Sequence, residues 1–231
     1  MDMVTLYLKD ALGEGCPVCR ILRKYEDSEM EVILYEHVND PDVRREFRKS
    51  LGLCTHHAWK LLGKAYSDPL LGPHGIAVIY SDMLSTYIDE LEGGAKEGGE
   101  CFLCRLVEEK ERTTVETFAE RIDEILPEYE RSGSILCKRH YEMVMDVLSK
   151  RNPEKAEELK RVQLEKLREL RDRLNSFVDK FDYQAESAPT EEEIASLPRA
   201  IEALKGLETG VERTDSKSRS RGLGWLRLKS K

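Results

Sequence analysis

The sequence lacks any apolar run that approaches the ~20 residues of a membrane-spanning helix. Hydrophobic residues make up 40% of its 231 residues, and charged residues, at 35%, interrupt them throughout. A hydrophobic fraction of this size is too high for a disordered chain. The composition therefore predicts a soluble globular protein with no membrane span.

A secretory leader is also missing from the N-terminus. Residues 1–5 have neither the basic segment nor the about 7 to 15 apolar residues of a signal peptide. We therefore expect a cytoplasmic protein, in a compartment that keeps thiols reduced. Under those conditions paired cysteines indicate metal ligands or redox groups more than structural disulfides.

Side-chain amides are scarce as well. Charged residues make up a third of the chain, a balance typical of thermophilic proteins. The only Asn and Gln residues are Asn39, Asn152, Gln163, Asn175 and Gln184.

Helix signals dominate the sequence, and strand signals are nearly absent. Asp40 followed by Pro41 is typical of a helix start, and residues 76–91 place apolar side chains at spacings of three and four. Asn152 precedes a long helical pattern that continues to about residue 183. The sequence therefore predicts an all-α protein.

A last helix is predicted after Thr190, which forms a capping box with Glu193. Pro198 is expected to disturb this helix, and Gly206 is expected to end it.

All six cysteines belong to a duplicated pattern. Cys-Pro-Val-Cys at 16–19 recurs as Cys-Phe-Leu-Cys at 101–104, and Cys-Thr-His-His at 54–57 recurs as Cys-Lys-Arg-His at 137–140. One offset relates position 16 to 101 and 19 to 104, and a slightly smaller one relates 54 to 137 and 57 to 140. Because only one histidine follows Cys137, the repeat selects His57 over His56 as its partner.

Three cysteines and one histidine complete the tetrahedral ligand set of a structural zinc ion. An iron–sulfur cluster is an alternative because such clusters accept histidine, and a redox-active thiol protein is another. The predicted ligands are Cys16, Cys19, Cys54 and His57 in one site, and Cys101, Cys104, Cys137 and His140 in the other.

The segments between the ligand pairs are long enough for antiparallel helical hairpins. Their predicted legs span residues 18–37 and 41–51 in the first half, and 103–119 and 120–131 in the second. We therefore expect two duplicated helical-hairpin units, each with a Cys3His site at its base, followed by a long C-terminal helix.

Composition divides the chain further. The predicted segments are a first metal-binding repeat (1–92), a glycine-rich linker (93–100), a second repeat (101–150), C-terminal helices (151–208) and a basic flexible tail (209–231). Four glycines in the nine residues from 92 to 100 define the linker.

Charge is unevenly spread, since the net charge of −8 combines an acidic body with a basic end. Seven basic and two acidic residues follow position 210, which leaves −13 for the preceding residues. An acidic body repels phosphate backbones. Nucleic-acid binding is therefore predicted only for residues 211–231.

The segments Leu34 to Arg44 and Ser50 to His57, with the cysteine pair at 16–19 and Phe181 to Tyr183 downstream, resemble a family of uncharacterised archaeal and bacterial proteins. The resemblance implies an all-helical prokaryotic protein with cysteine-rich sites. It assigns no activity.

No phosphate-binding loop or nucleophile elbow is present, and a filled Cys3His site offers no open position for substrate. No catalytic residue and no organic-cofactor site is predicted. The leading hypothesis is therefore a non-enzymatic scaffold that is stabilised by zinc and binds an unknown protein partner. An iron–sulfur or thiol-redox electron-transfer protein is the first alternative, and a nucleic-acid-associated protein is the second.

Overall fold

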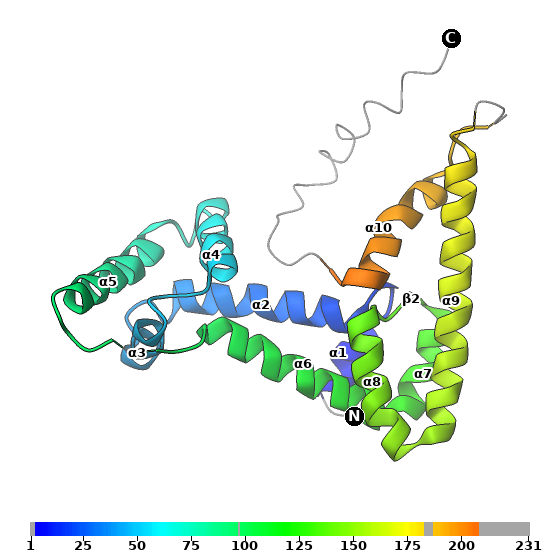
Figure 1. Ribbon diagram of the computed structural model, residues 1–231, viewed down its shortest axis with the longest axis horizontal. Helices are drawn as coiled ribbons and strands as arrows, with labels where there is room; N and C mark the ends of the chain where they lie inside the picture. The colour runs from blue at the N-terminus through cyan, green and yellow to red at the C-terminus, as the bar shows by residue number, and fades with distance from the viewer. Residues whose placement is uncertain (1–2, 97, 183–186, 208–231) are drawn as a thin grey trace, which may run out of the picture.

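The structure is a computed structural model that describes residues 3–96, 98–182 and 187–207. It confirms the all-α prediction (Figure 1). The helices in the described residues are α1 (Met3–Ala11), α2 (Pro17–Tyr35), α3 (Pro41–Lys49), α4 (Thr55–Ser67), α5 (His74–Leu91), α6 (Phe102–Glu120), α7 (Ile122–Arg131), α8 (Lys138–Arg151), α9 (Pro153–Asp179) and α10 (Glu191–Lys205).

Several helix ends follow from the capping residues in the sequence. The Asp40 side chain accepts hydrogen bonds from the first backbone N–H groups of α3, and Asn152 does the same for α9. Thr190 forms the predicted capping box, and Gly206, with a φ of 82°, ends α10. Pro198 lies inside α10 and does not end it.

Two 19-residue helices, α2 and α6, form the middle of the molecule. They lie side by side and run in opposite directions (Figure 1). At the start of α6 lie α3, α4 and α5, whereas α1, α7, α8 and α9 gather at the start of α2. The two halves of the sequence are therefore joined along the α2–α6 pair.

Each end of this pair has its own hydrophobic core, and each core takes residues from both halves. The larger core combines the first half of α2 with the end of α6 and with α1, α7, α8 and α9. The second combines the end of α2 with the start of α6 and with α3, α4 and α5. These two cores thus each need residues from both halves, whereas a smaller cluster of Ile135, Leu170 and Ala203 lies within the second half.

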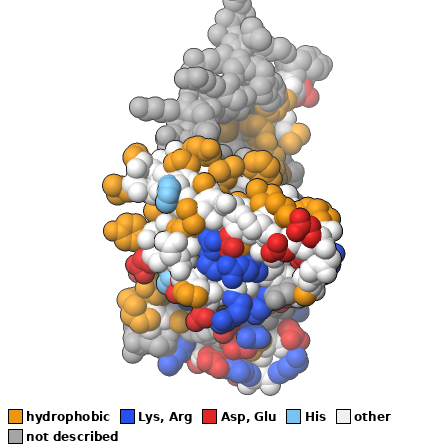
Figure 2. Space-filling view, turned by 90° about the vertical axis from the view of Figure 1, so that its left-hand side faces the viewer, with side chains coloured by type: hydrophobic (Ala, Val, Ile, Leu, Met, Phe, Trp, Pro, Cys, Tyr) orange, Lys and Arg blue, Asp and Glu red, His pale blue; other side chains and the backbone are white. Residues whose placement is uncertain are grey.

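Ion pairs hold α3 against α5 at the second core. Arg44 and Arg48 of α3 donate hydrogen bonds to Asp82 of α5 at 2.9 and 3.0 Å. Figure 2 views this end of the molecule, where basic side chains gather among hydrophobic ones. In the described residues, every helix is too short or too polar to cross a membrane.

Two short strands lie just before two of the cysteine motifs. Glu14–Gly15 (β1) pairs in parallel with Gly133–Ser134 (β2), and the backbone N–H of Ile135 donates to the carbonyl of Gly15 at 3.0 Å. This ladder fixes the chain before Cys16 against the chain before Cys137. It is the first indication that motifs from opposite halves meet.

Candidate metal centres

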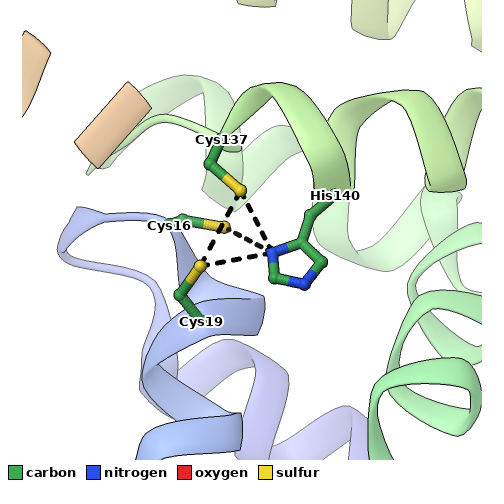
Figure 3. Close-up of side chains that lie close together, drawn as sticks. All are labelled: Cys16, Cys19, Cys137 and His140. Carbon is green, nitrogen blue, oxygen red and sulfur yellow. Dashed lines mark hydrogen bonds between the residues drawn. The ribbon is translucent and has the colours of Figure 1, made fainter. Parts of the chain in front are cut away.

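Four side chains from opposite halves of the chain converge at the junction of α2 and α8 (Figure 3). His140 Nδ1 lies 3.4 Å from Cys16 Sγ, 3.3 Å from Cys19 Sγ and 3.2 Å from Cys137 Sγ. The sulfurs of Cys19 and Cys137 are 3.7 Å apart. We call this group the closed site.

A second group has nearly the same dimensions at the junction of α4 and α6. His57 Nδ1 lies 3.2 Å from Cys54 Sγ, 3.4 Å from Cys101 Sγ and 3.3 Å from Cys104 Sγ. Cys54 Sγ and Cys104 Sγ are again 3.7 Å apart. We call this group the open site, because Cys104 is exposed to solvent.

The eight residues singled out from the sequence are thus brought together, but their expected pairing is wrong. Each Cys-x-x-Cys motif meets the Cys-x-x-His motif of the other half, not that of its own. The reason is the length of the return legs: α2 rises about 28 Å over 19 residues, whereas the nine residues of α3 return only about 14 Å. Each group therefore joins two halves and does not close the base of one hairpin.

The spacing of the donor atoms suits one tetrahedral ion. With Zn–S bonds near 2.3 Å and Zn–N bonds near 2.0 Å, a tetrahedron has S–S edges of about 3.8 Å and S–N edges of about 3.5 Å. The observed separations are 3.7 Å and 3.2–3.4 Å. Both Cys3His groups could therefore hold a metal ion.

Local helix geometry places these side chains. The first cysteine of each motif is the N-cap residue of a helix, at Cys16, Cys54, Cys101 and Cys137. The second ligand of each motif follows three residues later in the first helical turn. Free backbone N–H groups and the positive end of the helix dipole stabilise thiolate at these positions.

Sequence reasoning missed one functional residue at each group, a buried glutamate. Glu111 of α6 lies 2.8 Å from His140 Nε2, and Glu26 of α2 lies 3.1 Å from His57 Nε2. A carboxylate on the far nitrogen of a ligating imidazole fixes the tautomer and orients the ring. The offset that relates Cys16 to Cys101 also relates Glu26 to Glu111, and it could have identified both glutamates.

The two glutamates carry negative charge in spite of their burial. Burial raises the pKa of Glu111, but contacts with His140 and Arg139 outweigh it and lower this pKa to about 2. At Glu26 burial is likewise outweighed by His57 and Lys60, and the pKa is again about 2. Both carboxylates are therefore ionised at neutral pH.

The pKa values of the two histidines are raised, in contrast to those of the glutamates. Burial lowers the pKa of His140, but Cys137, Cys19 and Glu111 outweigh it and raise the value to about 11. For His57 the corresponding contacts with Cys101 and Glu26 raise the pKa to about 10.

One thiol in each group shifts toward the thiolate. Burial raises the pKa of Cys101, but His57 lowers it to about 6. Hydrogen bonds with Cys16 and Cys19 hold the pKa of Cys137 far below its usual range. The directions of these shifts favour a thiolate beside a protonated imidazole in each group, and a bound cation would take the place of that proton.

Residues at the end of α10 lie over the closed site. The Glu202 carboxylate of α10 accepts a hydrogen bond from the backbone N–H of Cys16 at 2.8 Å. A Cβ atom on Gly206 would lie 3.4 Å from Cys19 Sγ and 3.8 Å from Cys137 Sγ, so the backbone itself seals the sulfurs. The open site has no comparable cover in the described residues.

Comparison with known proteins places this chain in a family. Residues 1–100 and 94–210 each match the family of unknown function DUF6062, so the chain belongs to that family. The double match agrees with the duplicated unit, and the resemblance to a family of uncharacterised proteins is confirmed.

A relative with a comparable length has no assigned role either. It is an uncharacterized 23.9 kDa protein in the xynA 3' region of Caldicellulosiruptor sp. (strain Rt8B.4). The two are 27% identical over 209 residues, which cover 84% of this chain and 97% of the relative. No solved structure matches this chain.

Proposed function

We propose that this protein is a cytoplasmic helical scaffold in which two zinc ions hold the two halves of the chain together. The observation that carries the proposal is the convergence of three sulfurs and one imidazole nitrogen at each of two points. The eight predicted ligands fill both sets, with three thiols and one imidazole in each. Such a filled set leaves no open coordination position for substrate, which supports a structural role over a hydrolytic one.

The same distances favour a single ion over an iron–sulfur cluster. Sulfurs 3.7 Å apart, with the imidazole nitrogen 3.2–3.4 Å from each, surround a space about the size of one ion. A cluster must also fit its bridging sulfides and further irons between the same ligands. Zinc therefore ranks above the cluster alternative.

An exposed apolar surface supports a protein partner. Four side chains of α5 are between 47% and 70% exposed, at spacings of three and four residues along the helix. Surfaces of this kind commonly bind other proteins. The four residues are Leu84, Tyr87, Ile88 and Leu91.

The basic tail gives no comparable support, because residues 211–231 lie outside the described part of the chain. Nucleic-acid binding through this segment therefore stays a prediction. Truncation after Gly210 should abolish any salt-sensitive binding, and equal binding by the truncated chain would exclude it.

Elemental analysis and a visible spectrum test the metal directly. We expect two equivalents of zinc per chain purified without air, and no absorption near 400 nm. A strong chelator should remove the zinc and lower both helicity and melting temperature, because structural zinc contributes on the order of 10 kcal/mol to folding in small domains. A brown protein, or full stability after verified metal removal, would contradict the proposal.

Paired substitutions test the crossed ligand sets. Cys16→Ser with Cys137→Ser removes two ligands from one group and should leave one zinc per chain. Cys16→Ser with Cys54→Ser removes one ligand from each group and should leave none. The pairing first expected from the sequence predicts the reverse, so the zinc content of these two matched variants decides between them.

A further inference from the structure

Two equivalent thiol pairs differ in their access to solvent. Cys19 and Cys137 in the closed site, and Cys54 and Cys104 in the open site, each have sulfurs 3.7 Å apart. In the closed pair Cys137 is 1% exposed and Cys19 is 9% exposed. In the open pair Cys104 is exposed and Cys54 is half-buried.

The cover explains this difference. Gly206 and Glu202 of α10 lie against the closed site, and the β1–β2 ladder passes beside it. The open site is approached from solvent at Cys104, in the first turn of α6. An oxidant in solution would therefore reach the open pair first, since cysteine oxidation depends on exposure as well as thiolate character.

We propose that Cys54 and Cys104 are a modification site at which a hydroperoxide forms a disulfide, with loss of metal from the open site alone. The loss of metal rests on the proposed function, because it requires a bound zinc ion. Formation of the disulfide does not. The bond would connect the residue that begins α4 to the first turn of α6. It would therefore keep the halves joined after the ion has left.

The chemistry balances with hydrogen peroxide as the oxidant. Ligation of the metal ion would hold Cys104 as a thiolate. This thiolate attacks one peroxide oxygen, which yields a sulfenic acid and, after protonation of the leaving hydroxide, water. The Cys54 thiolate then attacks the sulfenic sulfur and displaces a second hydroxide, which is also protonated to water. Two thiolates and two protons thus reduce one peroxide to two waters, and the zinc ion, having lost two of four ligands, dissociates.

Reduction follows the ordinary exchange route. A small thiol attacks the disulfide, forms a mixed disulfide, and a second thiol releases the remaining cysteine. Zinc then binds again.

The experiment uses the full chain after its zinc content has been measured. Hydrogen peroxide is added at a few equivalents, and released zinc is followed with a chromogenic chelator. Remaining thiols are alkylated in denaturant, and cross-linked peptides are mapped by mass spectrometry. We expect one zinc per chain to leave together with a Cys54–Cys104 cross-link, while Cys16, Cys19 and Cys137 stay alkylated.

Two matched variants sharpen the result. Cys104→Ser should abolish the cross-link, whereas Arg105→Gln, at the neighbouring exposed position, should leave it unchanged. Release of both ions at the same rate, or cross-links among the cysteines of the closed site, would overturn the inference. If the purified chain holds no zinc, the proposed function fails, and the peptide map still decides whether this disulfide forms.

Discussion

The closed and the open site have nearly the same ligand geometry in different surroundings. Their nitrogen-to-sulfur distances are 3.2, 3.3 and 3.4 Å in both, and each site lies where a helix of one half meets a helix of the other. Yet among the residues that the structure describes, only those at the end of α10 cover a site, and they cover the closed one. The two sites thus share the arrangement of their four side chains, whereas their solvent access differs with the cover from α10.

The charged partners behind the histidines also differ. Arg139 binds both oxygens of Glu111 at 2.8 and 2.7 Å, and so holds this carboxylate in a bidentate pair. In the open site His56 stands at the equivalent position, 3.3 Å from Glu26, and Lys60 contacts the other oxygen at 2.8 Å. The closed site thus combines more deeply buried cysteines with a bidentate pair on its glutamate.

Loss of a ligand should separate the two sites most strongly. Cys137→Ser and Cys54→Ser should each remove one zinc, but Cys137 lies in the larger core, and its loss leaves a buried hydroxyl and an unpaired ligand set. We expect the melting temperature to fall by about 10 °C for Cys137→Ser and by about half as much for Cys54→Ser, since 1 kcal/mol shifts a chain of this size by about 2–4 °C. Calorimetry of the two variants, each lacking one zinc ion, would measure the two melting temperatures. An equal decrease in both would show that the two sites contribute equally to stability.

Removal of a buried carboxylate should weaken zinc binding less than removal of a ligand does. Each removal should affect only the site whose histidine that carboxylate contacts. Glu111→Gln should lower zinc affinity about 10- to 100-fold at the closed site, and Glu26→Gln should do so at the open site. Chelator competition measures each effect in a background that retains one site, Cys54→Ser for Glu111 and Cys16→Ser for Glu26. If Glu26→Gln left the zinc affinity of the Cys16→Ser background unchanged, the crossed arrangement would be wrong.

A hydrogen-bond network beside the closed site gives the next test. The Tyr129 hydroxyl donates to Gln163 and accepts from the backbone N–H of Leu136 at 2.9 Å, while Gln163 donates to the Leu136 carbonyl at 2.8 Å. Tyr129→Phe leaves these buried groups unpaired and should cost about 1–3 kcal/mol. Denaturant unfolding measures the loss. Tyr35→Phe, at an exposed tyrosine, is the control and should change stability little.

The sequence could identify the eight candidate ligands and most helices because both depend on local spacing. Cysteines three residues apart, caps such as Asp40 and Thr190, and apolar residues at helical spacing all act within a few turns of chain. Comparison of the two repeats added the choice of His57 over His56. The structure agrees, since His57 Nδ1 faces the three sulfurs whereas His56 Nε2 faces Glu26.

The pairing of motifs could not be predicted in the same way, because a repeat satisfies both arrangements equally. Uncrossed pairing requires return legs as long as the outgoing helices, and α3 and α7 are only 9 and 10 residues long. The cover over the closed site is harder still. Glu202 and Cys16 are separated by 186 residues, and no local pattern connects them.

The cover itself gives the smallest and most selective test. Gly206 and Gly93 both have positive φ angles, 82° and 98°, a conformation that residues with a side chain rarely adopt, so alanine should be destabilising at either position. Only at Gly206 would the new methyl group contact the sulfurs of Cys19 and Cys137, whereas a Cβ on Gly93 meets nothing within 4 Å. Gly206→Ala should therefore speed zinc release from the closed site to a chelator, and Gly93→Ala should not. Equal release rates would show that α10 does not limit access, and the contrast between the two sites would then rest on the buried core beneath the sulfurs.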